Sequence, residues 1–371
     1  MGLVDELYSK YLRPQKTIET NIIDRRDTRI FLKQEFVYNS WDILLNIKRK
    51  PAYYLFHDLY NKGIIKDGMK LISASSGNFV LNLGIKANEY GLKLIAVIPP
   101  RIPEENVKAL TSLGVDVIHI TEEFDMCPRE TTVFYTRSLA ENYRYILVNV
   151  DQYISWQNVL SHFFLTWNEI KSEFEQIDYI IIALGSTGTY MGVSLGNKVG
   201  RLAKEVIGVQ PPHEHNIPGV HHIVDGCEWN PEIFSPSIGG YIITVDDVDT
   251  YRWLAILEDK GIHVGPSTAM LYAAVERLSR ERPGDYLIVS PDSDRLYRNH
   301  LLRIYNKLYN DIVSRYPEDK EIIDRFIRDL RGREDIDIPK YIKRYYKPRE
   351  EGRVYEISKL DRDYISKILS R

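Results

Sequence analysis

The sequence predicts an α/β protein whose sheets are parallel and covered by helices on both faces. Three observations support this prediction. Apolar segments of strand length alternate with segments of helical spacing from about residue 29 to residue 290. Some of these strands, such as 94–98 and 179–184, are apolar throughout, which is typical of strands buried on both faces. Turns rich in Gly, Ser and Thr connect several strands to the helices that follow them.

The individual elements can be placed in order along the chain. Residues 1 to about 28 are polar with short apolar stretches, and we expect an arm that lies on the body. Pro51 lies in the first turn of a helix, and Gly91 and Gly114 each end one. Strands are predicted at residues 29–34, 70–72, 92–98, 115–120, 145–150, 179–184, 206–210, 241–245 and 286–290. Helices are predicted at residues 50–63, 78–90, 104–113, 130–143, 156–174, 188–204, 248–260 and 267–280.

From about residue 298 the composition changes. Residues 301–316 have helical spacing, and the remainder is dense in Arg, Lys, Asp, Glu and Tyr. Because the two signs of charge are mixed, this part is expected to be a solvated, mostly helical C-terminal extension rather than a basic tail. We place this extension at residues 299–371.

Composition excludes several classes of protein. A chain of 371 residues with 44% hydrophobic and 27% charged residues is typical of a soluble protein of about two domains. The net charge of −3 gives no overall attraction to nucleic acid, and no apolar run is long enough to span a membrane. No secretory signal is visible, so we expect a cytoplasmic protein. The two cysteines, Cys127 and Cys227, are too few for a disulfide framework or a zinc site, and no metal ligand is predicted. Abundant Ile, Tyr, Lys, Arg and Glu favour a thermophile.

Two turns between a strand and a helix are candidate anion sites. Residues 75–78 place two serines, a glycine and an asparagine at a helix N-terminus, where backbone N–H groups and hydroxyls suit a carboxylate or a phosphate. Residues 185–189 form the better phosphate cradle, because small residues let the backbone approach the ligand closely. Neither turn is a Walker loop, and each also fits an ordinary connection between a strand and a helix.

Two further features lie along the same part of the chain. Lys48 directly precedes a predicted helix, and the segment Pro291-Asp292-Ser293 follows the last predicted strand. The order of Lys48, residues 75–80, residues 185–189 and residues 291–293 resembles the fold-type-II pyridoxal-phosphate enzymes of the cysteine synthase and cystathionine β-synthase family. The segment Gly261-Ile262-His263-Val264-Gly265-Pro266-Ser267 resembles a further motif of this family. Residues 149–153 and 210–220 are most similar to the archaeal O-phosphoserine sulfhydrylases within it.

The resemblance implies a role for each motif, with pyridoxal 5'-phosphate as the cofactor. Lys48 would hold the cofactor as a Schiff base and later act as acid and base. Asn78 would hydrogen-bond the ring hydroxyl of the cofactor, and Ser293 would face its pyridine nitrogen. The residues that would grip the cofactor phosphate are Gly185, Ser186, Thr187, Gly188 and Thr189. The residues that would bind the substrate are Ser75, Ser76, Phe79, Gln152 and His221.

The resemblance also implies an architecture and an activity. The fold would contain two three-layer domains with parallel sheets, similar to the tryptophan synthase β-subunit. Residues 1–36 and 151–298 would form the large cofactor-binding domain, and residues 37–150 a small, mobile substrate domain of a homodimer. The enzyme would make cysteine from O-phosphoserine or O-acetylserine and sulfide, through an aminoacrylate intermediate.

Other functions remain open at this point. A cystathionine β-synthase-like enzyme, which uses another thiol, or a serine or threonine dehydratase would share the same motifs. A non-catalytic binding or regulatory protein is the third alternative, because the chain departs from the family pattern. Arg49 stands where the family has Asp, Phe79 follows Asn78, and His221 and His222 replace an arginine of the phosphoserine enzymes.

Overall fold

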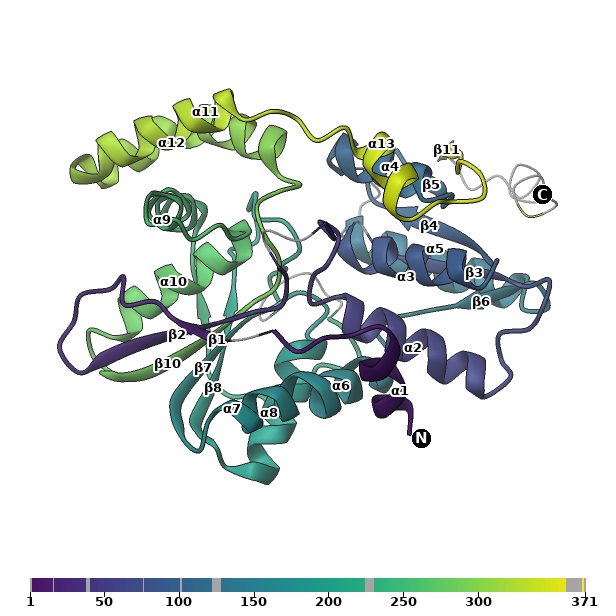
Figure 1. The fold of residues 1–371 in the computed structure, drawn as a ribbon, viewed down its shortest axis with the longest axis horizontal. Helices are drawn as coiled ribbons and strands as arrows, with labels where there is room; N and C mark the ends of the chain where they lie inside the picture. Colours follow the sequence, from purple (N-terminus) through teal and green to yellow (C-terminus); the bar gives the residue numbers. More distant parts are fainter. Residues whose placement is uncertain are drawn as a thin grey trace. The chain divides into compact units, whose positions relative to one another are not determined.

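The computed structural model divides the chain into two compact units. The first unit contains Met1–Asp58 and Gln152–Ile336, and the second contains Leu59–Asp151 and Asp337–Arg371. Each unit contains one sheet (Figure 1). The structure describes residues 2–15, 17–37, 41–75, 77–100, 102–121, 128–223, 230–357 and 369. The sequence predicts domain boundaries between residues 36 and 37 and between residues 150 and 151. In the structure the corresponding boundaries lie between residues 58 and 59, inside a helix, and between residues 151 and 152.

The elements alternate as the sequence predicts. The strands are β1 (Thr17–Glu19), β2 (Thr28–Gln34), β3 (Lys70–Ala74), β4 (Lys93–Ile98), β5 (Asp116–Ile120), β6 (Leu147–Asn149), β7 (Ile177–Ala183), β8 (Ala203–Gln210), β9 (Ile242–Thr244), β10 (Gly284–Ser290) and β11 (Val354–Ile357). The helices are α1 (Leu3–Lys10), α2 (Arg49–Asn61), α3 (Asn78–Glu89), α4 (Glu104–Ser112), α5 (Pro128–Asn142), α6 (Trp156–Ser161), α7 (Asn168–Glu173), α8 (Gly188–Gly200), α9 (Asp247–Asp259), α10 (Pro266–Leu278), α11 (Arg298–Arg315), α12 (Lys320–Gly332) and α13 (Ile338–Tyr345). A π-helical segment, His162–Trp167, joins α6 to α7, and a 3₁₀ turn, Pro317–Asp319, precedes α12.

The sheet of the first unit has the strand order β1-β2-β10-β7-β8-β9. Its strands are parallel except for β1, which pairs with β2 in the antiparallel direction. In the register of β2 and β10, Leu32 lies opposite Ile288. The prediction of a parallel sheet is confirmed, and the C-terminal ends of β7 and β10 meet at the same edge of the sheet, where the predicted site loops follow them.

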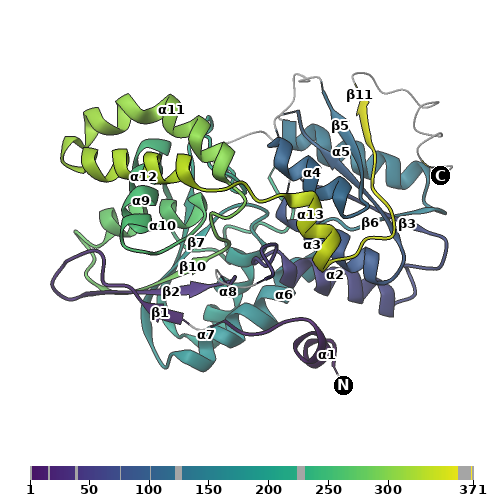
Figure 2. The same cartoon turned by 45° about the horizontal axis from the view of Figure 1, so that its top comes forward.

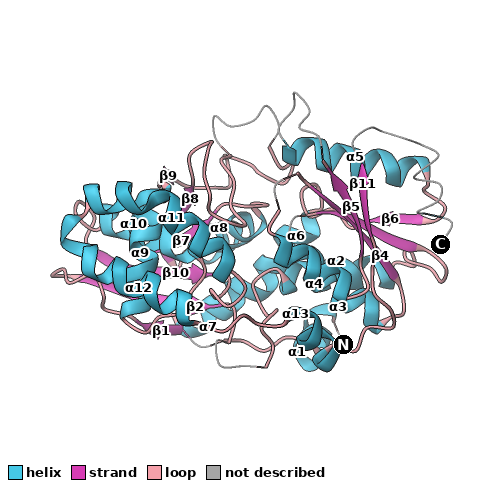
Figure 3. Ribbon diagram, turned by 90° about the horizontal axis from the view of Figure 1, so that it is seen from above, coloured by secondary structure: helices cyan, strands magenta, loops and turns pink. Residues whose placement is uncertain are grey.

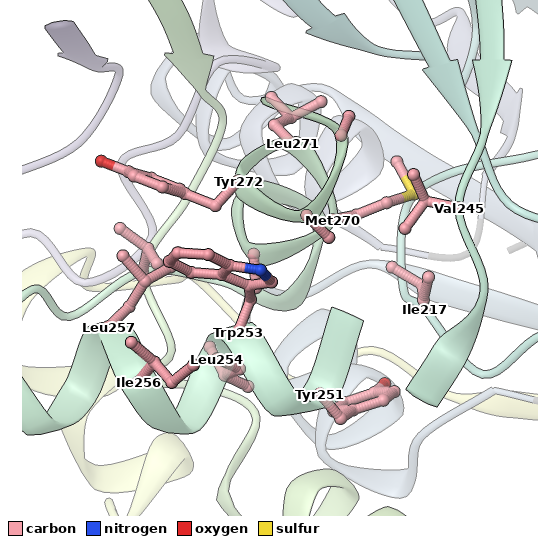
Figure 4. Close-up of a cluster of buried hydrophobic side chains, with 14 of the residues drawn as sticks. Ile217, Val245, Tyr251, Trp253, Leu254, Ile256, Leu257, Met270, Leu271 and Tyr272 are labelled. Carbon is pink, nitrogen blue, oxygen red and sulfur yellow. The ribbon is translucent and has the colours of Figure 1, made fainter. Parts of the chain in front are cut away.

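Both faces of this sheet are buried, as the apolar strands predict. In β10, Tyr286 and Ile288 join one hydrophobic cluster, whereas Leu287 and Val289 join the other. The first cluster is shared with α9 and α10, and Figure 4 shows side chains of those helices, including Trp253 and Tyr272, packed together. The second cluster includes side chains of α8 and of the π-helical segment. This three-layer arrangement of helices, sheet and helices is visible in Figure 1.

The sheet of the second unit is parallel throughout, with the order β11-β5-β4-β3-β6. Helix α5 covers one face through Tyr135 and Leu139, and α3 and α4 lie on the other face (Figure 3). The edge strand β11 comes from the C-terminal extension and pairs with β5. Among the described residues, no helix is long and apolar enough to cross a membrane.

The C-terminal extension is helical, as predicted, but it belongs to the body of the protein. Helices α11 and α12 lie beside α9 (Figure 2), and their apolar side chains join the first hydrophobic cluster. Helix α13 and β11 belong to the second unit. One face of this charged segment therefore supplies core residues. The predicted N-terminal arm likewise contains a short helix, α1, and a strand, β1.

We expect the extension to depend on Gly352. Its N–H donates to Thr111 O (2.7 Å), and a Cβ there would lie 1.8 Å from Val115 O. Gly352→Ala must therefore displace the segment that leads into β11, with a loss of about 1–3 kcal/mol in the free energy of unfolding. Urea unfolding and limited proteolysis of the C-terminus measure this. The matched control is Gly332→Ala, where a Cβ meets nothing within 4 Å. Equal urea-unfolding midpoints for the two variants would show the prediction to be wrong.

Candidate active site

The turn between β7 and α8 lets the backbone approach a ligand closely. A Cβ on Gly185 would lie 2.5 Å from Gly219 O, and a Cβ on Gly188 would lie 2.1 Å from Asn158 Oδ1. Both positions therefore require glycine. Farther along α8, a Cβ on Gly192 would lie 2.5 Å from Val159 O, so α8 packs directly against the helical segment that carries residues 156–173.

Thr187 has the most unusual backbone of this turn. Its φ is +66°, a left-handed conformation that β-branched residues rarely adopt, and it precedes the first residue of α8. Its Oγ1 is buried and has no hydrogen-bond partner within the described part of the chain. The first-turn N–H groups of α8 lack helical acceptors as well. An unused hydroxyl and free backbone N–H groups at a helix N-terminus fit an anion-binding loop.

Lys48 lies directly before α2 and is fixed on both sides. Ile47 N–H donates to Pro291 O (2.9 Å), and Lys48 N–H donates to Asn46 Oδ1 (3.0 Å). The Lys48 ammonium donates to Ser186 Oγ at 3.2 Å. The predicted cofactor lysine thus reaches the predicted phosphate loop. Arg49, which departs from the family pattern, forms a buried ion pair with Asp42.

Burial lowers the pKa of Lys48 to about 8, and the charge of Asp292 opposes this shift. Within the described part of the chain Lys48 forms no ion pair. About a tenth of its side chains is therefore a neutral amine at pH 7, and about half at pH 8, and the neutral amine is the nucleophilic form.

The loop after β10 carries Ser293 between two buried carboxylates. Gly265 N–H donates to Asp292 O (2.9 Å), and the hydroxyl of Tyr297 donates to Asp292 Oδ2 (2.6 Å). A Cβ on Gly265 would lie 2.1 Å from Asp292 Oδ1, so the Gly-Pro-Ser segment predicted from the sequence packs on this loop. Ser293 itself is half-buried.

Asp294, the next residue, is bound by the C-terminal extension. Arg333, which follows α12, forms ion pairs with both Asp294 and Glu258. His263 Nδ1 lies 3.0 Å from the same Glu258 oxygen, and the pKa of His263 is raised by this hydrogen bond. Burial and the charge of Glu258 raise the pKa of Asp294 to about 6, although Arg333 opposes this shift.

Several residues of the site escaped sequence reasoning. Asn158 Nδ2 donates to Ser186 Oγ (3.2 Å) and to Gln152 O (2.7 Å), and His162 Nε2 lies 3.2 Å from Thr189 Oγ1. Both residues come from the segment 156–167, which reads in the sequence only as an amphipathic helix. Burial, followed by the charges of Lys48 and Lys50, lowers the pKa of His162.

The remaining predicted ligands fall in three places. Gln152 is buried in the first unit, and its Oε1 has no hydrogen-bond partner among the described residues. His221 N–H donates to Leu184 O (2.7 Å), which places its backbone against the phosphate loop. In the second unit, Ser75 follows β3, and Asn78 and Phe79 open α3. Ser76 lies outside the described residues, as do Cys127 and Cys227.

The first unit thus brings together two predicted parts of a cofactor site. The loop 185–189 offers backbone N–H groups and an unused hydroxyl to an anion, and Lys48 offers an amine of lowered pKa beside that loop. Pyridoxal phosphate has a phosphate and an aldehyde, and these two groups fit the two features. No cluster of three or more potential metal ligands occurs among the described residues.

Comparisons with known proteins agree with this geometry. The model of the pyridoxal-phosphate dependent enzyme family matches residues 10–293. A cysteine synthase of Aquifex aeolicus is 29% identical over 263 residues, which cover 68% of this chain and 78% of the relative. The O-acetylserine dependent cystathionine β-synthase of Helicobacter pylori has a TM-score of 0.67 at 20% identity, over 80% of this chain and 96% of that one. A cysteine synthase of Entamoeba histolytica has a TM-score of 0.69 at 18% identity, over 88% and 95%.

The lowered pKa of Lys48 predicts an unusual reactivity. In the cofactor-free protein, acetylation of Lys48 by acetic anhydride should be half-maximal near pH 8. Lys204, whose pKa is raised by its hydrogen bond to Asp178, should react only at higher pH. Peptide mass spectrometry across a pH series measures both in one sample. Asp292→Asn should move the Lys48 midpoint lower still, and identical profiles for the two lysines would contradict the assignment.

The Arg333 ion pairs predict a pH-dependent loss of stability. Arg333→Met leaves the buried carboxylate of Asp294 without its counter-ion and should cost roughly 3 kcal/mol of the free energy of unfolding at pH 8. The loss should shrink below about pH 6, because protonated Asp294 no longer needs the guanidinium. Arg325→Met, which removes a more exposed pair with Asp259, is the control and should cost less than about 1 kcal/mol. Denaturant titrations at pH 5 and pH 8 test this, and a pH-independent loss would contradict it.

Proposed function

Because this chain belongs to the pyridoxal-phosphate dependent enzyme family, we propose that it makes cysteine by β-replacement on an activated serine. In this reaction the Cβ–O bond of O-acetylserine or O-phosphoserine breaks, and a Cβ–S bond to sulfide forms. The activating group leaves as acetate or phosphate. The similarity to a cysteine synthase supports this reaction class.

The observation that carries the proposal is the position and charge state of Lys48. Its amine has a pKa of about 8 and lies 3.2 Å from Ser186 Oγ in the anion-binding loop. When bound, pyridoxal phosphate withdraws electrons from Cα of an attached amino acid, which lets the Cα proton and the β-substituent leave. A lysine that is neutral near pH 8 can bind the cofactor aldehyde and, once released, can hold the proton taken from Cα.

The other residues then divide into two groups. Gly185, Ser186, Thr187, Gly188 and Thr189 would bind the cofactor phosphate, and Asn78 would bind the ring hydroxyl. The proposed substrate ligands are Ser75, Ser76, Phe79, Gln152 and His221. Gln152 supports this assignment best, because its buried Oε1 is unused within the described part of the chain.

Ser293 supports β-replacement rather than transamination. We assign it to the pyridine nitrogen, because both neighbouring carboxylates already have partners in Tyr297 and Arg333. A hydroxyl leaves that nitrogen less protonated than a carboxylate does. The ring is then a weaker electron sink, which favours loss of a β-substituent over long-lived carbanion chemistry.

His221 is the residue we propose for recognition of the activating group. If it contacts the phosphate of O-phosphoserine, His221→Asn should raise the KM for O-phosphoserine several-fold and leave the KM for O-acetylserine unchanged. Equal effects on both substrates would remove His221 from this role.

The visible absorption spectrum tests the proposed function. Protein supplied with pyridoxal phosphate should absorb in the visible range, and Lys48→Ala should abolish the covalent linkage that borohydride traps on the wild type. Lys204→Ala, an exposed lysine paired with Asp178, is the matched control and should behave as wild type.

Serine, O-acetylserine and O-phosphoserine are then added in turn. One ester should change the spectrum, and sulfide should restore it as cysteine forms. Restoration only by homocysteine would instead indicate a cystathionine β-synthase-like enzyme, and ketoacid formation without a thiol would indicate a dehydratase. A protein that takes up no pyridoxal phosphate would overturn the proposal.

A further inference from the structure

Lys50, two residues after Lys48, lies at one end of a chain of buried polar groups. Its ammonium lies 2.7 Å from Glu35 Oε2 and 2.8 Å from Glu169 Oε2. It also donates to Thr166 Oγ1 at 3.3 Å. Thr166 is fully buried in the π-helical segment. An ammonium group has donors only, so the Thr166 oxygen must be the acceptor in this contact.

The chain of contacts continues through His162 to the phosphate loop. Thr166 Oγ1 lies 3.0 Å from His162 Nδ1, and His162 Nε2 lies 3.2 Å from Thr189 Oγ1. A Cβ on Gly192 would lie 2.6 Å from His162 Cβ, so the close packing of α8 fixes this arrangement. Lys50 is thus connected to Thr189 by three consecutive contacts.

The directions of these hydrogen bonds follow from counting donors and acceptors. His162 is fully buried and its pKa is lowered, so its neutral ring has one donor and one acceptor nitrogen. Within the described part of the chain, the Thr166 hydroxyl has no acceptor other than His162 Nδ1. If Nδ1 carried the proton, the buried Thr166 O–H would have no acceptor, which costs about 1–3 kcal/mol. Nδ1 is therefore the acceptor, and Nε2 carries the proton.

The consequence reaches the cofactor loop. His162 Nε2–H donates to Thr189 Oγ1, so the hydroxyl proton of Thr189 is not used by His162. The structure contains no second protein partner for that hydroxyl among the described residues. Its proton can then be donated to an anion bound at the N-terminus of α8.

We propose that Lys50 is a positioning residue which, through Thr166 and His162, orients the hydroxyl of Thr189 toward the cofactor phosphate. This inference rests on the proposed binding of that phosphate by residues 185–189. This positioning role gives a reason for the buried cation at position 50 in addition to its ion pairs. Either Lys or Arg would serve, because both are pure donors.

The first test reads the tautomer of His162 directly. In ¹⁵N-histidine-labelled protein near pH 7.5, the His162 ring should show a protonated Nε2 and an unprotonated Nδ1, with its signals identified by their loss in His162→Gln. This measurement needs no activity and no variant of Lys50. A proton on Nδ1 in the wild-type protein would overturn the proposal.

The second test cuts the chain of contacts without removing a charge. Thr166→Val should shift the His162 tautomer and weaken binding of pyridoxal phosphate about tenfold, measured by equilibrium dialysis in the Lys48→Ala background, where no covalent bond forms. The matched control is Thr250→Val, because the buried Thr250 hydroxyl donates to the backbone oxygen of Asp246 (2.8 Å). Unchanged affinity and tautomer in Thr166→Val would overturn the proposal.

Two variants of Lys50 separate orientation from ion pairing. Lys50→Arg should keep the wild-type tautomer and affinity, whereas Lys50→Met should resemble Thr166→Val if it folds. The ³¹P signal of bound pyridoxal phosphate should move in Thr166→Val and stay in place in Thr250→Val. Failure of the proposed function would appear differently, as a wild-type protein that binds no pyridoxal phosphate even though His162 has the expected tautomer.

Discussion

The buried cluster of Lys33, Glu35, Lys50 and Glu169 is the constraint on which the first unit depends. These two cations and two anions come from β2, the residue after β2, α2 and α7, and Lys33 Nζ lies 2.7 Å from Glu169 Oε2. Removing four charges from water is costly unless each finds its partner. The three segments β2, α2 and α7 therefore have to meet in one arrangement. Tyr8 of α1 adds a hydrogen bond to Glu169 Oε1 (2.7 Å), which holds the N-terminal arm to the same cluster.

This cluster explains how two lysines two residues apart acquire opposite properties. Lys50 lies between two carboxylates and forms an ion pair with each of them. Lys48, one residue before α2, has a hydroxyl as its nearest partner and a lowered pKa. A carboxylate beside Lys48 would keep it protonated and unreactive. The fold thus places the carboxylates of Glu35 and Glu169 beside Lys50 and not beside Lys48, so the amine of Lys48 can react.

The parallel sheets and the site loops could be predicted because their signals are local. Strands such as β7 are apolar on both faces, and the Gly-rich turn that follows β7 limits the backbone to one kind of geometry. The charge cluster could not be predicted, because Lys33 and Glu169 look like surface residues in the sequence and lie far apart in it. The π-helical contacts of His162, and the short strands β1 and β11, likewise depend on partners that no local pattern reveals.

The C-terminal extension shows how a segment outside the family match can become part of the enzyme. The family model ends at residue 293, one residue before Asp294, whose counter-ion Arg333 comes from the extension. The same extension packs on α9, which shares the first hydrophobic cluster with one face of the first sheet, and supplies an edge strand to the second sheet. A segment that contributes to both cores does not behave as a removable tail. Because Asp294 adjoins Ser293, the Arg333 ion pair joins the extension to the residue next to the proposed cofactor-nitrogen contact.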